Sequence, residues 1–323
     1  MLLDVKNLNV GFLVKGKLMH IIHNVNFSLR EGEVLSMIGE TGCGKSVTGS
    51  TILHLLPDNA KVEGSITYRD KDITHMPRKQ FHKLRGSEIV AVPQSPSTSL
   101  DPLMQVGIQV EEAVTKRADF KGGKEAREQV RSKVGELFRR MQLPGGEQVY
   151  SKYPCELSGG MCQRILIAMG AVTKPSLLIV DEPTKAIDWV LRADVVEVLR
   201  RQKQEIGCAI LMITHDIGVA RNLSDRIAVM YAGEIVELGT TAQVLDETKH
   251  PYTEGLLNSL PGRGFQVMKG FMPSFEALPS GCRFSDRCPY ATERCCREEP
   301  GWHTLEDGHL VHCHRWEGGS SHA

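Results

Sequence analysis

One segment near the amino terminus restricts the fold more than any other part of the chain. Residues 39–46 read GETGCGKS, which matches the phosphate-binding pattern G-x-x-x-x-G-K-[ST] of a P-loop. The apolar residues 34–38 before it predict a buried strand, and residues 47–56 after it predict a helix that ends before Pro57. Backbone N–H groups in such a loop surround a phosphate at the positive end of a helix. The segment therefore predicts a nucleoside triphosphate site in an α/β fold.

Each position of this loop has an expected task. Lys45 would neutralise charge on the β- and γ-phosphates, and the Ser46 hydroxyl would bind Mg²⁺. The other nucleotide-binding candidates are the remaining loop residues and the residue after it: Gly39, Glu40, Thr41, Gly42, Cys43, Gly44 and Val47.

Cys43 supports a separate hypothesis. A thiol beside Lys45 and a helix N-terminus should have a lowered pKa and react readily with alkylating reagents, and bound ATP should protect it. The alternative is a passive small side chain.

Length and charge limit the class of protein. With 323 residues the chain exceeds a typical domain, so we expect one large domain and an appendage. Thirty-nine basic residues balance 39 acidic ones, which gives no electrostatic reason to expect nucleic acid as a partner. No apolar run approaches the ~18–20 residues that span a bilayer, and residues 1–6 lack the pattern of a signal peptide. We therefore expect a cytoplasmic location, with any membrane attachment made through a partner.

Apolar patterns predict two kinds of sheet. Alternating residues at 2–10, 25–29 and 64–68 predict a partly exposed antiparallel sheet. Continuous apolar runs predict buried strands of a mostly parallel sheet, since they alternate with helical segments such as 190–204; these runs are residues 89–92, 177–180 and 209–213. A hairpin is expected around Gly233, between residues 227–231 and 234–238.

The middle and the end of the chain differ from these strands. Residues from 95 to about 170 read as helical, with one apolar face formed by Val130, Val134, Leu137, Phe138 and Met141. After residue 260 the chain is rich in turns and has little periodicity. We therefore expect a boundary near residue 261.

Two further segments carry chemistry. Asp181 and Glu182 follow a buried strand, where Asp181 can hold Mg²⁺ through water and Glu182 can orient or deprotonate the attacking water; the alternative is a pair of solvated acids. Ser158, Gly159 and Gly160 precede a helical run, so Ser158 is a candidate N-cap and the glycines expose N–H groups that could bind a second anion. In isolation this second segment could be a capped loop.

In this order the motifs resemble those of the ATP-binding subunit of an ABC transporter. They are the P-loop, Gln94, the LSGG segment at 157–160, the Asp181-Glu182 pair, Asp188 and the ITHD segment at 213–216. The resemblance covers residues 1–260. It implies a P-loop cassette with a mostly parallel core sheet, an N-terminal antiparallel β-subdomain and a helical subdomain at about residues 95–170.

The resemblance also implies catalytic roles in ATP hydrolysis. Glu182 would be the general base, and His215 would contact the γ-phosphate beside Lys45. Gln94 would couple Mg²⁺ and water to a membrane subunit, and together with Ser46 and Asp181 it would complete the Mg²⁺ site.

Family members work as head-to-tail dimers, which implies that ATP lies between the P-loop of one chain and the LSGG segment of another, called the signature segment. Ser158, Gly159 and Gly160 would then contact the partner's nucleotide, and Asp188 would cross the dimer interface. Phe12 would stack on adenine; the alternative is an apolar strand residue of the core. The implied partners are a like or unlike ATP-binding subunit, two membrane-spanning permease subunits and an extracytoplasmic substrate-binding protein, with this chain on the cytoplasmic face of the inner membrane.

Residues 261–323 resemble the cysteine-rich extension of the dipeptide, oligopeptide and nickel importer branch. The matching segments are GFMP at 270–273, GCRF at 281–284, RCPY at 287–290 and CH at 313–314, together with HPYT at 250–253 just before the extension. In that branch four cysteines can hold a [4Fe–4S] cluster, here Cys282, Cys288, Cys295 and Cys313, with Cys296 as an alternative third ligand. Zinc and unligated or disulfide-bonded thiols remain alternatives. The gaps of five and six residues exceed the usual spacing of zinc ligand pairs, which counts against zinc.

The leading function is therefore an ATPase that energises import of di- or oligopeptides or nickel complexes. A soluble ABC ATPase of translation or DNA repair is opposed by the single cassette and by the ordinary length of the helical insert. A third hypothesis, regulation of the same ATPase by a redox- or metal-sensing tail, does not exclude the first.

Overall fold

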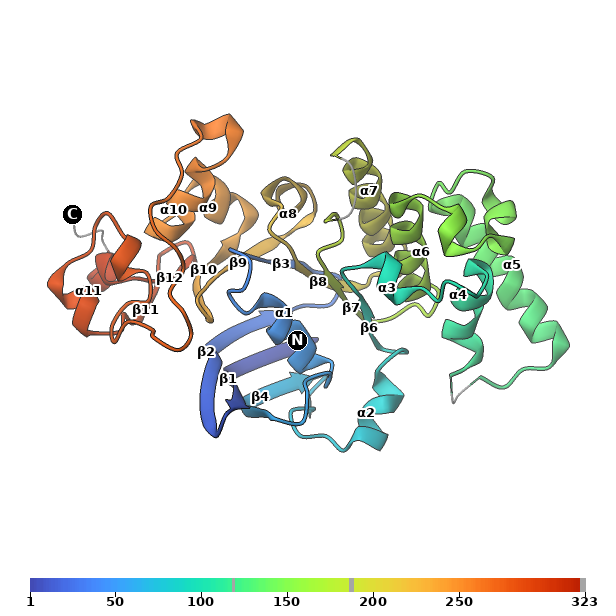
Figure 1. The fold of residues 1–323 in the computed structure, drawn as a ribbon, viewed down its shortest axis with the longest axis horizontal. Helices are drawn as coiled ribbons and strands as arrows, with labels where there is room; N and C mark the ends of the chain where they lie inside the picture. Colours follow the sequence, from blue (N-terminus) through green and yellow to red (C-terminus); the bar gives the residue numbers. More distant parts are fainter. Residues whose placement is uncertain (118–119, 186–188, 320–323) are drawn as a thin grey trace.

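The computed structural model describes residues 1–117, 120–185 and 189–319. Two sheets form its centre (Figure 1). The smaller sheet is antiparallel and has the order β2-β1-β4-β5. Its strands are β1 (Leu3–Val14), β2 (Lys17–Leu29), β4 (Ala60–Tyr68) and β5 (Lys71–Asp72). The antiparallel sheet expected before and after the P-loop is confirmed.

The larger sheet has eight strands in the order β11-β12-β10-β9-β3-β8-β7-β6. The five strands from β9 to β6 are parallel, whereas β9, β10, β12 and β11 pair with one another antiparallel, so the core sheet is mixed. The hairpin expected around Gly233 is β9 and β10. The strands are β3 (Val34–Ile38), β6 (Ile89–Val92), β7 (Leu177–Asp181), β8 (Ala209–Ile213), β9 (Arg226–Tyr231), β10 (Glu234–Thr240), β11 (Trp302–Thr304) and β12 (Leu310–His312).

Helices cover the core sheet and form a separate group beside it. Figure 1 places α4, α5 and α6 at one end of the molecule and the segment that contains α11 at the other. The helices are α1 (Lys45–Ile52), α2 (Arg78–Leu84), α3 (Pro96–Ser99), α4 (Val106–Thr115), α5 (Lys124–Arg140), α6 (Gly159–Ala171), α7 (Trp189–Ile206), α8 (Ile217–Leu223), α9 (Thr241–Asp246), α10 (Pro251–Asn258) and α11 (Glu293–Arg297). Short 3-10 turns lie at Gly146–Ser151, Pro154–Glu156, Pro261–Arg263, Ser285–Arg287 and His314–Gly319. In the described residues no helix is long and apolar enough to cross a bilayer.

The core strands read as continuous apolar runs because both faces of their sheet are covered. Side chains alternate along a strand, so Leu177 and Ile179 point into the core shared with the antiparallel sheet, while Leu178 and Val180 point into the core shared with the helices. Along α5 the expected apolar face is confirmed, since its residues contact the core that lies between the sheet and the helices. The two cores hold β3, β7 and β8 rigidly between them.

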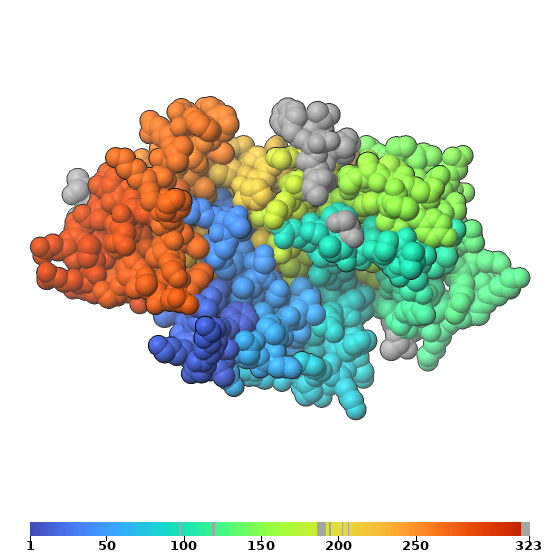
Figure 2. All heavy atoms as spheres, in the orientation of Figure 1, coloured from blue at the N-terminus to red at the C-terminus, as the bar shows by residue number. Residues whose placement is uncertain are grey.

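The segment after residue 260 packs against the cassette and extends its sheet. β12 pairs with β10, and β11 pairs with β12. His309 Nε2 lies 2.9 Å from Glu237 Oε1, with both side chains fully buried. In Figure 2 the orange and red atoms of this segment lie directly against the blue atoms of the amino-terminal residues. The division at residue 260 stays a prediction, because strands on both sides of it belong to one sheet.

Candidate functional site

The P-loop connects β3 to α1 and takes a backbone conformation that requires glycine. Gly39, Gly42 and Gly44 have φ angles of 149°, 86° and 111°, in the region that side chains with a Cβ rarely adopt. A Cβ on Gly39 would also collide with the backbone oxygen of Met230 on β9. The glycines therefore let the loop lie directly on the neighbouring strand.

Lys45 begins α1 and is buried within the loop. Its Nζ donates hydrogen bonds to the backbone oxygens of Gly39, at 2.7 Å, and Glu40, at 2.8 Å. The ammonium group is thus held over the first turn of the loop. This position suits a cation that must meet a phosphate bound by the loop's N–H groups.

A cavity of about 210 Å³ lies at this loop and brings most of the predicted site together. Three strands end here at the same edge of the sheet, as expected for ligand sites in parallel sheets. Gln94 follows β6, Glu182 follows β7 and His215 follows β8. The lining residues are Thr41, Gly42, Gly44, Lys45, Ser46, Val47, Gln94, Glu182, Lys185 and His215. Among them, Lys185 was not predicted as a site residue.

Asp181 and Ser46 lie next to each other, as a shared Mg²⁺ site requires. The Ser46 hydroxyl is within hydrogen-bonding reach of the Asp181 carboxyl. Burial raises the pKa of Asp181, and the Ser46 hydrogen bond opposes that shift. Its Oδ1 atom is buried without a hydrogen-bond partner in the described part of the chain. A hydroxyl beside a carboxylate oxygen without a partner is a donor set that fits a hard cation such as Mg²⁺.

Glu182 is held by both its backbone and its side chain. Its φ angle of 47° is unusual for a residue with a Cβ, and its N–H donates to the backbone oxygen of Ile213 at 2.8 Å. The carboxylate accepts a hydrogen bond from His215 Nδ1 at 2.8 Å. Backbone strain of this kind is common at functional sites, and here it places the carboxylate in the cavity.

The signature segment, residues 157–160, lies outside the P-loop cavity. Ser158 Oγ accepts a hydrogen bond from the N–H of Met161 at 3.3 Å, which confirms Ser158 as the N-cap of α6. Of the described residues, neither Ser158 nor the following Gly159 and Gly160 lines the P-loop cavity. Asp188, expected at a dimer interface, lies outside the described residues.

Phe12 lies on β1, opposite Met19 of β2 and Ala60 of β4. It is half-buried and packs against the core beneath the antiparallel sheet. It does not line the P-loop cavity. Adenine stacking by this residue therefore stays a prediction.

The hypothesis of a reactive Cys43 is wrong. The side chain is fully buried, and burial raises its pKa more strongly than Lys45 lowers it. Lys45 Nζ does lie 3.7 Å from the Cys43 sulfur, but its charge does not outweigh the desolvation of a thiolate. The loop motif indicated the neighbouring charge, whereas the burial comes from the packing of Cys43 into a core that includes residues far from the loop in sequence.

We expect Cys43 to be alkylated at least roughly tenfold more slowly than the exposed Cys155 and Cys296, with or without ATP, because a buried neutral thiol is a poor nucleophile. Mass spectrometry of peptides after timed iodoacetamide treatment measures all three rates in one sample. Fast labelling of Cys43 that ATP slows would contradict this prediction and restore the original hypothesis.

The four cysteines predicted as cluster ligands come together in the extension. Cys282, Cys288, Cys295 and Cys313 line one small cavity of about 20 Å³, together with Tyr290, Arg315 and five other residues. Burial raises the pKa of Cys282 to about 12 and that of Cys288 to about 11. Cys296, the alternative third ligand, is exposed and does not line this cavity.

Sequence reasoning missed an ion pair between the P-loop and the extension. The Arg287 guanidinium donates to both carboxylate oxygens of Glu40, at 3.0 and 3.1 Å. The Glu40 N–H donates to Tyr252 Oη at 2.9 Å. Because Glu40 and Arg287 are 247 positions apart in the sequence, no local pattern could reveal the pair.

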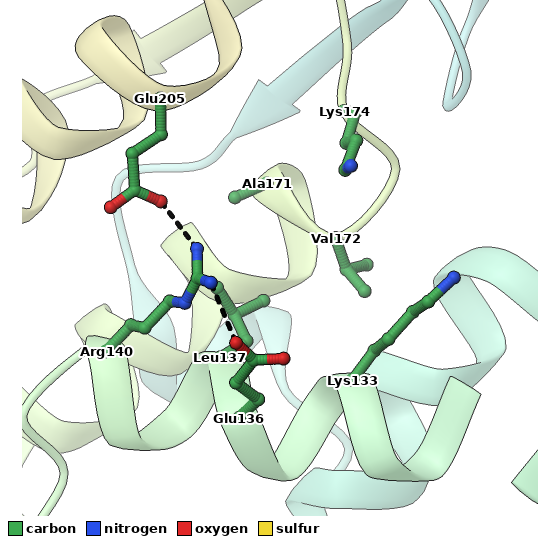
Figure 3. Close-up of a pocket in the computed structure, with 8 residues that line it drawn as sticks. All are labelled: Lys133, Glu136, Leu137, Arg140, Ala171, Val172, Lys174 and Glu205. Carbon is green, nitrogen blue, oxygen red and sulfur yellow. Dashed lines mark hydrogen bonds and ion pairs between the residues drawn. The ribbon is translucent and has the colours of Figure 1, made fainter. Parts of the chain in front are cut away.

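Another hollow, of about 260 Å³, lies between α5, α6 and α7. Figure 3 shows Arg140 at its centre, joined to Glu136 on its own helix and to Glu205 on α7. None of the residues predicted from the motifs lines it. Its contacts join the helical segment to the core and supply no group for the nucleotide site.

Comparison with known proteins agrees with this geometry. Residues 22–185 match the family model of the ABC transporter, and residues 236–295 match that of the oligopeptide/dipeptide transporter, C-terminal region. The chain is 37% identical over 323 residues to the oligopeptide transport ATP-binding protein AppD of Bacillus subtilis, a match that covers 98% of this chain and 97% of that protein. It is 38% identical over 304 residues to OppD of Escherichia coli, which covers 93% of this chain and 89% of that protein.

The fold is similar to that of the ATP-binding cassette MJ0796, solved as a dimer in a post-hydrolysis state with ADP and Pi. The TM-score is 0.66 at 26% identity, and the match covers 74% of this chain and 98% of that one. The chain therefore belongs to the ATP-binding subunits of ABC transporters, in the oligopeptide/dipeptide importer family, and is an ATPase that hydrolyses ATP.

Proposed function

We propose that Glu182 is the general base of ATP hydrolysis and that His215 positions it. The observation that carries this assignment is their 2.8 Å hydrogen bond at the mouth of the P-loop cavity. A carboxylate oriented by an imidazole can accept a proton from the attacking water. The second ring nitrogen of His215 would then contact the γ-phosphate.

The remaining residues of the cavity bind and orient the nucleotide. P-loop N–H groups surround the phosphates, and Lys45 neutralises their charge. Ser46, Asp181 and Gln94 would hold Mg²⁺, which supplies charge stabilisation at the β- and γ-phosphate oxygens when it is bound. Lys185 adds a second cation that faces the same cavity. These residues work by positioning and by electrostatic stabilisation.

The active unit is a head-to-tail pair of ATP-binding subunits. Support comes from the position of Ser158, Gly159 and Gly160, which lie outside the cavity of their own chain. They form the start of α6, where Ser158 and Gly159 are exposed and Gly160 is buried. In a head-to-tail pair they would close the nucleotide site of the partner, and Asp188 would lie at the interface. The second subunit is a copy of this chain or a related ATPase.

We propose di- and oligopeptides as the transported substrates, in a complex on the cytoplasmic face of the inner membrane. The relatives from B. subtilis and E. coli are named oligopeptide transport ATP-binding proteins, and the matching C-terminal model is that of oligopeptide and dipeptide transporters. The complex would contain two permease subunits and take substrate from an extracytoplasmic binding protein.

The test is ATP hydrolysis by the complete complex in proteoliposomes. This chain would be co-purified with the permease subunits and the binding protein encoded beside it. Peptide-loaded binding protein should stimulate hydrolysis, and nickel-chelate-loaded binding protein should not. Stimulation by nickel chelates alone would overturn the peptide assignment, and ATP hydrolysis that no permease influences would instead favour a soluble ATPase.

We propose that Cys282, Cys288, Cys295 and Cys313 hold a [4Fe–4S] cluster. A tetrahedral zinc site with Zn–S bonds near 2.3 Å places its sulfurs roughly 3.8 Å apart. Among residues 1–117, 120–185 and 189–319, three or more ligand atoms within 4.8 Å of one another occur only at His23, Glu234 and Glu299, and not among the cysteines. Four thiols around one cavity at a wider spacing suit a cluster, in which each thiolate binds a different iron.

Replacing Cys295 with serine should therefore remove most of the iron, whereas the adjacent Cys296→Ser variant should keep it. Anaerobically purified wild-type protein should be brown and contain about four iron atoms per chain. Iron and zinc analysis with visible absorption measures both outcomes. One zinc per chain in a colourless preparation, or iron loss in the Cys296 variant alone, would contradict the assignment.

A further inference from the structure

Arg287 belongs to the extension but reaches the nucleotide-binding loop. Its guanidinium group is almost completely buried, with 7% of the side chain exposed. Its two terminal nitrogens donate hydrogen bonds to the two carboxylate oxygens of Glu40. Its Nε donates to the backbone oxygen of Lys269 at 3.1 Å, and Nη1 also donates to the Tyr231 hydroxyl at 3.3 Å. The planar group is therefore fixed by partners on several sides, and only an arginine presents this two-pronged geometry.

Glu40 helps to hold the Lys45 side chain in place. The backbone oxygen of Glu40 accepts a hydrogen bond from Lys45 Nζ, its N–H donates to Tyr252, and its carboxylate meets Arg287. The first turn of the P-loop is thus held through a single residue by two contacts from the carboxyl-terminal part of the chain. A shift of Glu40 would move the acceptor of the catalytic lysine.

Charge gives Arg287 a second effect. Glu40 is the only acidic residue within the loop sequence, and 27% of its side chain is exposed. Without a partner its carboxylate would place a negative charge beside the site of a triphosphate, where little water screens it. Arg287 neutralises that carboxylate while it holds the loop.

Arg287 also connects the loop to the cysteine cavity. It ends the short turn Ser285–Arg287, and the next residue, Cys288, lines that cavity. The N–H of Cys288 donates to Ser285 at 3.3 Å, across the same turn. The ion pair and one of the four cysteines of the cavity therefore belong to the same short turn.

We propose that Arg287 is a positioning residue of the nucleotide site: through Glu40 it holds the P-loop in the conformation that binds triphosphate. The extension is then part of the support of the ATPase site, whatever its cysteines bind. The inference rests on the ATPase activity of the chain and needs no cluster.

The experiment measures ATP and ADP affinity and steady-state hydrolysis for variants of the full chain. Arg287→Ala should raise the nucleotide dissociation constant and KM about tenfold or more, because it releases the first turn of the P-loop and leaves the partly buried Glu40 carboxylate unpaired. The value of kcat at saturating ATP should stay within about threefold, since Glu182 and His215 are untouched. The nucleotide affinity of Arg287→Lys should lie between those of the wild type and Arg287→Ala. A lysine keeps the positive charge but cannot donate to both carboxylate oxygens in the same planar geometry.

A second substitution separates positioning of the loop from neutralisation of charge. In the Arg287→Ala background, Glu40→Gln removes the unpaired charge and should recover only a minor part of the lost affinity, because the contact that holds Glu40 is still missing. Arg297→Ala is the matched control, an arginine of the same extension whose side chain is 77% exposed and pairs only with Glu293 among the described residues; it should leave all constants unchanged. Thermal unfolding and iron content are recorded for every variant.

An affinity within twofold of wild type in folded Arg287→Ala protein would overturn the proposal. So would a double variant that regains the full wild-type affinity, because neutralising Glu40 would then replace the contact entirely. If Arg287→Ala does not fold, the Arg287→Lys variant decides: unchanged nucleotide affinity in that folded protein contradicts the role of the two-pronged contact. A fall in kcat alone would also contradict it, because positioning of the P-loop predicts a change in KM.

Discussion

The Glu182→Gln variant should hydrolyse ATP roughly 10²–10⁴-fold more slowly than the wild type, while its affinity for ATP stays nearly the same. Glutamine keeps the size of the side chain and can still hydrogen-bond with His215, but it cannot accept the proton of the attacking water. The P-loop and Lys45, which we propose bind the phosphates, are unchanged. The loss should therefore appear in kcat.

Phosphate release at saturating ATP and equilibrium nucleotide binding measure the two quantities separately. Glu205→Gln is the matched control, because Glu205 is half-exposed on α7, pairs with Arg140 and does not line the P-loop cavity. Because blocked hydrolysis keeps ATP in place, the Glu182 variant should also accumulate as a nucleotide-bound dimer in gel filtration. A Glu182→Gln variant with near-normal turnover would show that another group activates the water.

Gly39→Ala should weaken nucleotide binding roughly a hundredfold and lower the melting temperature. At the φ angle of 149° an alanine is strained, by about 1–3 kcal/mol. The added Cβ would also meet the backbone oxygen of Met230, which is part of β9 and cannot move aside. The loop would have to leave the strand, and each shift of about 1.4 kcal/mol in binding free energy changes the dissociation constant tenfold.

Fluorescent-nucleotide titration and thermal unfolding measure both effects. Gly16→Ala separates the collision from the strain, because Gly16 has a φ angle of 78° but no heavy atom within 4 Å of its added Cβ. That control should lose a little stability and bind nucleotide normally. Equal behaviour of the two variants would contradict the role assigned to the contact with Met230.

Most of the fold could be predicted because its signals are local. The strands of the core sheet are short apolar runs bounded by turns, and the expected strands at 89–92, 177–180 and 209–213 are β6, β7 and β8. Edge pairing was harder to predict. The pairing of β12 with β10 depends on contacts between segments about 70 residues apart, so the two antiparallel edge strands β12 and β11 were not predicted.

By itself the sequence determined the nucleotide site and the position of its main groups. Lys45, Ser46, Asp181 and Glu182 each lie at the end of a strand or the start of a helix, so their motifs also specify the local backbone that presents them. Parallel strands then bring those ends to a single edge of the sheet.

Only the tertiary structure decided the state of Cys43 and the pairing of Glu40 with Arg287. Burial of a thiol depends on which strands cover it, and an ion pair across 247 residues depends on where the extension docks. Neither property is encoded in a contiguous segment. Both arise from packing between distant parts of the chain, and packing sets the local dielectric and the distance between charges.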